Sequence, residues 1–308
     1  MLYPKQYPMG KTSQKSVTKL IIPLAGFGTR FLPSSKNYPK EMINLVDRPV
    51  IQYLVEEAHD SGIKEIIFVL NYSKDIIPQY FSKSQHPHQK EAYKNSAAAK
   101  ENLAELDNLL SKIKFHKIKK TTTLGDGHSI SFAKSKIGPN EPFAVTMGDL
   151  LSPPGQPFLK QLIRVYQKTG EPVISVEQKP RAEVGKFGVI APKKSNGRLH
   201  LVGDLVEKPK PEEAPSTMVL TGKYILTPAI FQEIAKVMKN PPSGEVRLAD
   251  ALASYAKNNK LYAYECEGKI QDTGNKLDFL KATVEFAAAH KIFGSAFKSF
   301  LKSFTSEV

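Results

Sequence analysis

The sequence predicts an α/β fold, in which a mixed, mostly parallel sheet of Rossmann-like topology is flanked by helices. Two short apolar runs, at residues 20–22 and 65–71, are typical of strands that are buried on both faces. Between them, residues 50–61 place apolar side chains at helical spacing, and Gly62 follows as a helix end. A strand, a helix and a strand in this order form a βαβ unit, which predicts parallel pairing through a right-handed crossover.

The rest of the chain continues to alternate between strand and helix patterns. Further strands are expected at residues 143–147, 173–177, 188–191, 199–207 and 261–267. Further helices are expected at residues 75–81, 227–238, 247–257 and 275–291, together with a helix within residues 84–114 that packs outside the sheet. Ligands of such sheets bind beyond the carboxyl ends of the strands, so the loops that follow the strands are the expected site.

One continuous domain with terminal additions accounts for the whole chain. Residues 17–290 form the domain. Residues 1–16 have no apolar centre, so we expect a flexible arm and not a secretory signal. Residues 291–308 repeat Phe and Leu every three to four positions, which predicts an amphipathic C-terminal helix. That helix could dock on its own core, contact another subunit or lie on a membrane surface.

Composition narrows the possible partners. The formal net charge is +14, but the cations are spread along the chain without a Lys/Arg block. This distribution argues against nucleic-acid binding and favours anionic small molecules. No apolar run approaches the roughly 20 residues of a membrane span. The only cysteine, Cys266, excludes disulfides within the chain and cysteine-based zinc sites, and it fits a reducing cytoplasm.

The loop after the first strand carries the clearest chemical pattern. Its two glycines allow a sharp turn and a close approach of backbone N–H groups to a ligand. Arg30, Lys36 and Lys40 follow, although Lys36 could point into solvent, and such a loop with three cations suits a polyphosphate. No Gly-Lys-Ser/Thr makes it a P-loop, and the missing third glycine argues against a dehydrogenase. The residues expected at the nucleotide are Ala25, Gly26, Gly28 and Thr29.

Several segments together resemble the nucleotidyltransferases that make nucleotide sugars, and within them the bacterial UTP–glucose-1-phosphate uridylyltransferases. The resemblance covers about residues 19–290 and implies the nucleotide-diphospho-sugar transferase fold and a homo-oligomer. It also implies that UTP and glucose 1-phosphate react to give UDP-glucose and pyrophosphate, with Mg²⁺ as cofactor. The matching segments are residues 24–33, 39–42, 47–49, 206–210, 222–224 and 272–276.

The resemblance also implies roles for charged side chains. Asp149, which follows a predicted strand, and Asp272 would bind Mg²⁺, although either could be a helix cap. Arg30 and Lys40 would hold the triphosphate and the leaving pyrophosphate. Lys208 would hold the sugar phosphate, unless it is a solvated charge, and Glu207 would accept hydrogen bonds from the glucose hydroxyls. Glu41 could pair with Arg30 or Lys40.

Backbone positions complete the implied site, and one residue departs from the family pattern. Gly125 and Gly148 would face the nucleotide, whereas Gly188 and Gly222 would face the sugar. Lys120 stands where the family usually carries a Gln that binds uracil, and lysine donates but cannot accept hydrogen bonds. Either backbone groups of the Gly125 loop read the uracil, or the base selectivity is altered. A transferase for another base or sugar and a non-catalytic nucleotide-sugar-binding protein therefore stay open as alternatives.

Overall fold

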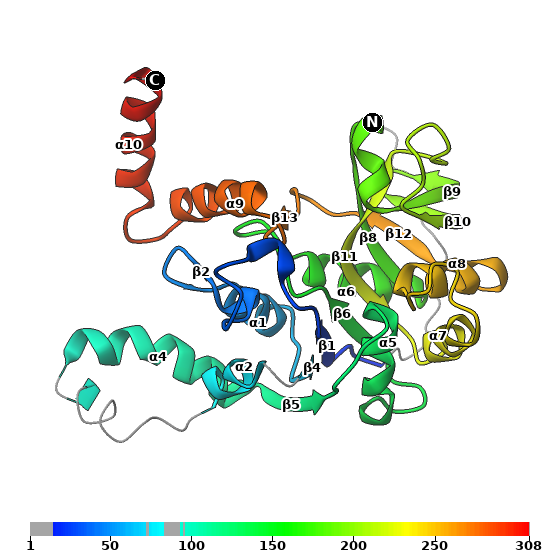
Figure 1. The fold of residues 1–308 in the computed structure, drawn as a ribbon, viewed down its shortest axis with the longest axis horizontal. Helices are drawn as coiled ribbons and strands as arrows, with labels where there is room; N and C mark the ends of the chain where they lie inside the picture. Colours follow the sequence, from blue (N-terminus) through cyan, green and yellow to red (C-terminus); the bar gives the residue numbers. More distant parts are fainter. Residues whose placement is uncertain (1–14, 72–73, 83–92, 95, 308) are drawn as a thin grey trace.

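The computed structural model describes residues 15–71, 74–82, 93–94 and 96–307. A nine-stranded mixed sheet forms the centre, with the strand order β5-β4-β1-β6-β11-β8-β12-β10-β9 (Figure 1). Its strands are β1 Lys19–Leu24, β4 Glu65–Leu70, β5 Lys114–Lys119, β6 Phe143–Thr146, β8 Val173–Gln178, β9 Gly188–Asn196, β10 Leu199–Glu207, β11 Met218–Leu226 and β12 Tyr262–Glu265. The predicted arm at residues 1–16 lies outside the described residues, apart from its last two positions.

Helices cover both faces of the sheet, and two short strand pairs lie outside it. The pairs are β2 (Asn44–Leu45) with β3 (Arg48–Pro49), and β7 (Leu150–Leu151) with β13 (Gln271–Asp272). The α-helices are α1 Val50–Asp60, α2 Ile76–Tyr80, α4 Ala97–Lys112, α5 Asp126–Ser131, α6 Phe158–Thr169, α7 Ile230–Lys239, α8 Leu248–Asn258, α9 Lys276–Ala288 and α10 Gly294–Glu307.

The predicted α/β class and the predicted βαβ unit are confirmed. β1 pairs in parallel with β4 and with β6, and β4 pairs in parallel with β5. β11 then runs antiparallel to both β6 and β8, and β10 runs antiparallel to β12 and β9. Antiparallel pairing is therefore more extensive than the sequence suggests, and it is concentrated in the C-terminal half.

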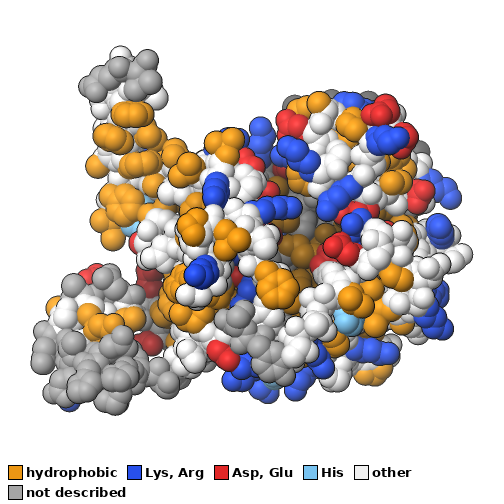
Figure 2. Space-filling view, in the orientation of Figure 1, with side chains coloured by type: hydrophobic (Ala, Val, Ile, Leu, Met, Phe, Trp, Pro, Cys, Tyr) orange, Lys and Arg blue, Asp and Glu red, His pale blue; other side chains and the backbone are white. Residues whose placement is uncertain are grey.

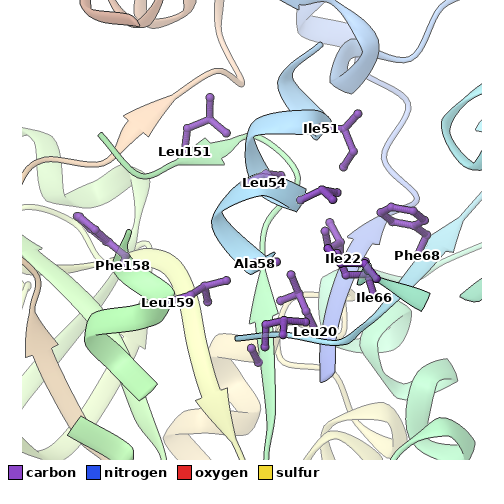
Figure 3. Packing of buried hydrophobic residues seen from close by; sticks show 14 of the residues in the cluster. Leu20, Ile22, Ile51, Leu54, Ala58, Ile66, Phe68, Leu151, Phe158 and Leu159 are labelled. Carbon is purple, nitrogen blue, oxygen red and sulfur yellow. The ribbon is translucent and has the colours of Figure 1, made fainter. Parts of the chain in front are cut away.

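The core lies on both sides of the sheet because successive strand residues point to opposite faces. Leu20 and Ile22 of β1 pack with α1, α4, α6 and α9 on one face, where Figure 3 shows them beside Leu54 and Phe68. Ile21 points to the other face, where it packs with α5, α7 and α8. Each fully buried side chain of this size contributes about 1.5–3 kcal/mol to folding, so two such layers hold the loops at the sheet edge firmly in place.

Two long elements were not predicted, for different reasons. β11 contains Gly222 at φ +74°, and its register shifts between Leu220 and Tyr224, so a bulge interrupts the strand pattern. α6 has no such interruption. Its buried side chains keep helical spacing and could have been recognised: Phe158, Leu159, Leu162, Ile163 and Tyr166.

The C-terminal helix α10 contacts α9 but projects away from the rest of the protein (Figure 1). Phe300 and Phe304 of α10 are 56% and 50% exposed, so the described residues do not show this helix docked on its own core. Figure 2 shows apolar side chains along most of its length. Among the described residues, no helix combines the length and the hydropathy needed to cross a membrane.

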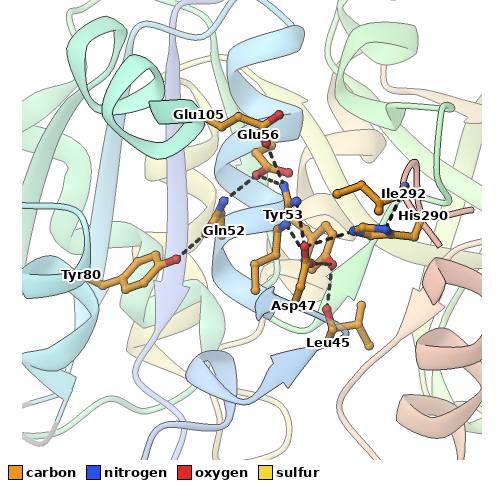
Figure 4. Close-up of polar contacts among 10 residues, drawn as sticks. Leu45, Asp47, Gln52, Tyr53, Glu56, Tyr80, Glu105, His290 and Ile292 are labelled. Atoms are coloured by element: carbon orange, nitrogen blue, oxygen red, sulfur yellow. Dashed lines mark hydrogen bonds and ion pairs between the residues drawn. The ribbon is translucent and has the colours of Figure 1, made fainter. Parts of the chain in front are cut away.

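A polar network anchors the segment from which α10 projects (Figure 4). His290, between α9 and α10, lies 3.1 Å from Asp47 Oδ2 and stacks on Phe293. Arg48 binds both Asp47 and Glu56 of α1. Residues 47–49, which match the family pattern, therefore have a structural role here, because they tie α1 to the segment before the C-terminal helix.

Candidate active site

The glycine loop begins where β1 ends, at the edge predicted for a ligand. The amide of Asn71 donates to the carbonyl of Ala25 at 3.1 Å, which fixes the start of the loop. Gly26 is exposed, and nothing lies within 4 Å of the position that a Cβ would occupy. Gly28 has φ +66°, which only glycine adopts without strain, and a short 3₁₀ turn at Thr29–Phe31 follows. This loop therefore exposes its backbone to an incoming group.

The cations predicted at the phosphates differ in their surroundings. Arg30 is exposed on the 3₁₀ turn, and no ion pair to it is found among the described residues. Lys40 is half-buried, and its Nζ lies 2.5 Å from Asp149 Oδ2. Burial opposes the charged form of Lys40, but the carboxylates of Asp149 and its neighbours outweigh this effect and raise its pKa. Lys40 is therefore held as a cation beside a predicted metal ligand.

Glu41 does not pair with Arg30 or Lys40, so that expectation was wrong. Both of its carboxylate oxygens accept hydrogen bonds from Lys74 Nζ at 2.8 Å, and both side chains are buried. Burial lowers the pKa of Lys74, although the Glu41 carboxylate opposes this change. Lys74 lies 33 residues after Glu41 in the sequence, so a local sequence pattern could not reveal this pair.

The two predicted metal ligands lie together across the small β7–β13 pair. Asp149 Oδ2 and Asp272 Oδ1 would lie 2.7 and 2.9 Å from a Cβ placed on Gly274, so both carboxylates face the same space. The Thr273 amide donates to the Asp149 carbonyl at 2.7 Å, and the Gly274 amide donates to Asp272 Oδ1 at 2.6 Å. Burial raises the pKa of Asp272, and the nearby Asp149 charge adds to this rise.

This pair of carboxylates fits a hard divalent cation. Mg²⁺ is held in proteins by one or two carboxylates together with phosphate oxygens and water. A cation between Asp149 and Asp272 would offset the burial and the repulsion that together raise the pKa of Asp272. No group of three or more metal-binding side chains occurs in the part of the chain that the structure describes, so the remaining ligands would come from substrate and water.

A cavity of about 240 Å³ opens beside this cluster. Figure 2 shows a hollow in this face of the protein, with acidic and basic side chains around it. Five residues predicted from the sequence line the cavity, namely Gly125, Gly188, Glu207, Lys208 and Gly222. Residues that were not predicted also line it, and they include Asp126, Leu150, Tyr224, Glu245 and Arg247.

Lys208 and Glu207 enter the cavity from the end of β10. Lys208 has φ +49°, which is uncommon for a residue with a side chain, and its amide donates to the Phe187 carbonyl at 2.9 Å. Its Nζ lies 3.7 Å from Glu207 Oε1. The Glu207 side chain is only 15% exposed, and burial raises its pKa. Gly188 lies beneath it, since a Cβ there would lie 3.0 Å from Glu207 Oε2 and 2.7 Å from Leu220.

The other glycines of the site serve close packing. Gly222 lies against Leu150 and Met147, and its φ of +74° also requires glycine. Gly148 packs against Leu24 at the end of β1, so a side chain there would push the loop before Asp149 away from the sheet. These contacts explain why glycine is needed at both positions, whether or not a ligand touches them.

The Gly125 loop is docked on the start of α8, which the sequence did not predict. A Cβ on Gly125 or Gly127 would approach the Val246 carbonyl to 2.6 or 2.9 Å. Asp126 Oδ1 accepts hydrogen bonds from the amides of Gly127 and Leu248, at 2.8 and 3.0 Å. Burial raises the pKa of Asp126 in spite of these bonds.

This docking places Arg247 in the cavity lining, where its Nε lies 3.2 Å from Glu245 Oε2. Nothing in the local sequence pattern indicates that Arg247 belongs to the site, because only the packing of two distant loops brings it there.

Lys120 is not among the residues that line the cavity. Its Nζ lies 4.6 Å above the ring of Phe132, and the His128 ring packs against the same phenyl group. His128 Nδ1 accepts a hydrogen bond from the Leu124 amide at 3.0 Å, so this side chain stabilises its own loop. Burial and the charge of Lys120 lower the pKa of His128.

The chain is similar to known proteins over most of its length. The family described as nucleotidyl transferase matches residues 19–289. The UTP–glucose-1-phosphate uridylyltransferase of Staphylococcus epidermidis is 39% identical over 295 residues, covering 94% of this chain and 98% of the relative. The enzyme of the same name from Bacillus subtilis is 39% identical over 277 residues, covering 90% of this chain and 93% of the relative.

Solved structures agree with these relatives. A UDP-glucose pyrophosphorylase complexed with UDP-glucose has a TM-score of 0.80 and 33% identity, covering 89% of this chain and 100% of that structure. UTP-bound UGPase from Acinetobacter baumannii has a TM-score of 0.82 and 33% identity, covering 92% of this chain and 98% of that structure. The predicted resemblance is thereby confirmed, and the chain belongs to the nucleotidyl transferase family.

Proposed function

We propose that this protein transfers a uridylyl group from UTP to glucose 1-phosphate, giving UDP-glucose and pyrophosphate. One observation carries the proposal: a cluster with Lys40, Asp149 and Asp272 lies beside a cavity that contains Lys208 and Glu207. The first part suits a nucleoside triphosphate, and the second suits a phosphorylated sugar. Relatives that carry the name of this activity match nearly the whole chain.

The reaction needs positioning and charge neutralisation more than acid–base catalysis. A phosphate oxygen of glucose 1-phosphate attacks the α-phosphorus of UTP, a new P–O bond forms, and the bond to the β-phosphate breaks in line. The attacking oxygen is already an anion, so no general base is required. Arg30 and Lys40 stabilise the triphosphate and the departing pyrophosphate, while Lys208 holds the sugar phosphate against the repulsion between the two substrates.

Asp149 and Asp272 would hold Mg²⁺, which supplies positive charge to the phosphate oxygens when it is bound. The backbone of Ala25, Gly26, Gly28 and Thr29 receives the nucleotide, and Gly125 and Gly148 support its other side. Gly188, Glu207 and Gly222 contact the sugar. The Glu207 side chain is well placed to accept hydrogen bonds from sugar hydroxyls, because it lies in the cavity and is largely buried.

We also propose that the protein acts in the cytoplasm as a homo-oligomer. The single, buried Cys266 fits a reducing compartment. Leu277, Leu280 and Val284 of α9 are exposed near the exposed apolar side chains of α10, and a second copy would cover this surface. Light scattering of the full chain and of a chain ending at His290 tests the oligomer, since the shorter chain loses part of this surface and should associate more weakly.

A nucleotide panel tests the proposed reaction. Purified protein is offered glucose 1-phosphate, Mg²⁺ and each of UTP, dTTP, CTP, ATP and GTP, and pyrophosphate release is measured. UTP should be preferred by at least an order of magnitude. Equal use of all the triphosphates would contradict uridylyl transfer, and product formation that survives Asp149→Ala would remove the metal site from the proposal.

A further inference from the structure

A buried ion pair outside the substrate-binding surfaces joins two elements of the core. Lys223 follows Gly222 in β11 and is fully buried, with 0% of its side chain exposed. Its Nζ lies 2.8 Å from Glu57 Oε2, and the Glu57 side chain in α1 is 7% exposed. Burying two charges costs several kcal/mol per ion before their attraction is counted, so such a pair requires an explanation beyond packing.

Each charged group has further partners on other elements. Lys223 Nζ also donates to Thr146 Oγ1 at 3.0 Å, at the end of β6. Glu57 Oε1 accepts hydrogen bonds from Ser152 Oγ at 2.7 Å and from the Leu159 amide at 3.0 Å, at the start of α6. The pair therefore connects α1, α6, β6 and β11, and every one of these hydrogen bonds joins a donor to an acceptor.

Lys223 also belongs to the β11 bulge that shapes the cavity. Gly222 precedes Lys223, lines the cavity, and accepts a hydrogen bond from the Met147 amide at 2.9 Å. Ser175 Oγ donates to the Lys223 carbonyl at 2.9 Å, and Thr221 Oγ1 donates to the same Ser175 hydroxyl. The two residues that flank Gly222 are thus fixed by side chains that never reach the substrate.

We infer that Lys223 and Glu57 are positioning residues, which hold the β11 bulge in register so that Gly222 forms the floor of the sugar site. Replacing a buried ion pair by neutral groups of similar volume is often neutral or stabilising, so stability alone does not account for keeping this one. A slip of the bulge would move Gly222, whereas the glycine loop after β1 would stay in place. The inference rests on the proposed function, because it assigns the cavity to the sugar phosphate.

The test is steady-state kinetics of a double variant, Lys223→Met with Glu57→Gln, which removes both charges together. Its KM for glucose 1-phosphate should rise at least tenfold, while its KM for UTP stays within about twofold and its melting temperature stays within a few degrees. A control double variant, Lys236→Met with Glu233→Gln, removes an ion pair on α7 and should change neither KM. Unchanged sugar kinetics in the first variant would overturn the inference.

Thr146→Val provides a second route if the double variant does not fold. It removes the bond from Lys223 to β6, together with a 3.5 Å contact from the same hydroxyl to the Met147 carbonyl, and it keeps the side-chain shape. It should raise the KM for glucose 1-phosphate several-fold without changing the KM for UTP. A variant with wild-type constants for both substrates would again overturn the inference. Wild-type protein is assayed in parallel, and its failure to make UDP-glucose would refute the proposed function, not the positioning role.

Discussion

The ammonium of Lys40 lies 2.5 Å from Oδ2 of Asp149, so a cation predicted to bind the phosphates contacts a carboxylate predicted to bind the metal. A metal ion that binds Asp149 must compete with this contact. A Lys40 ammonium that the metal displaces from Asp149 would be free to bind the triphosphate, whose negative charge would then replace that of the carboxylate. On the proposed roles of Lys40 and Asp149, metal binding and phosphate binding would be linked through one side chain.

Lys40→Met should bind Mn²⁺ more tightly than the wild type in the absence of nucleotide. The substitution removes the competing cation from Asp149, and a partly screened pair of this kind is worth about 1 kcal/mol or somewhat more, so an increase of about tenfold is expected. Electron paramagnetic resonance of free Mn²⁺ measures the affinity directly. Lys36→Met, at an exposed neighbouring position, serves as the control. Weaker or unchanged Mn²⁺ binding by Lys40→Met would contradict the competition.

Lys208→Ala should impair the use of glucose 1-phosphate more than the binding of UTP. Opposite charges about 4 Å apart attract by about 4 kcal/mol at an effective dielectric of 20, and the 49% exposure of Lys208 reduces this value. We expect kcat/KM for the sugar phosphate to fall by about a hundredfold or less, with a small change in UTP affinity measured by calorimetry. Lys210→Ala is the matched control, because Lys210 is 70% exposed and pairs with Glu213. Equal losses for both substrates would exclude the assigned role.

Lys120→Gln should leave the choice of base nearly unchanged. The Lys120 ammonium lies over Phe132 and not in the cavity lining, and a cation–π contact that is only partly buried is worth about 1 kcal/mol. The ratio of kcat/KM for UTP to that for dTTP or CTP should therefore change less than about threefold. A tenfold change in either ratio would show that this side chain reads the base, instead of backbone groups around Gly125.

Asp47→Asn should destabilise the protein at neutral pH but not at pH 2. Burial alone would raise the pKa of Asp47, but hydrogen bonds from Arg48 and His290 lower it to about 2. A folded-state pKa below the unfolded value stabilises the fold above about pH 4, and this contribution disappears as the pH falls towards 2. Because Asp47 is 40% exposed, the loss at pH 7 is limited to about 1 kcal/mol.

Urea unfolding at both pH values measures this contribution of Asp47. His290→Gln should produce a smaller loss with the same pH dependence, since it removes one of the three side chains that bind the Asp47 carboxylate, the others being Arg48 and Tyr53. A loss for Asp47→Asn that is equally large at pH 2 would contradict the electrostatic origin.

Local sequence patterns were sufficient for the first βαβ unit and for the loop that follows β1, whereas the strand β5 in the same half of the chain was not predicted. The apolar run of β1, the helical spacing of α1 and the glycine loop are all encoded within a few neighbouring residues. β11 was missed because the bulge at Gly222 breaks the alternation on which strand prediction depends. Arg247 joins the site only because Asp126 and two glycines of a distant loop pack on the start of α8.

Under the proposed assignment of substrates, the division of the sheet into a parallel part and an antiparallel part separates the glycine loop for the nucleotide from most of the residues for the sugar. The glycine loop follows the parallel strand β1, whereas Glu207, Lys208 and Gly222 belong to the antiparallel strands β10 and β11 or follow them directly. Donor and acceptor preferences can therefore diverge independently during evolution. Exchange of residues 188–226 between relatives should then change the sugar preference while the nucleotide preference is retained.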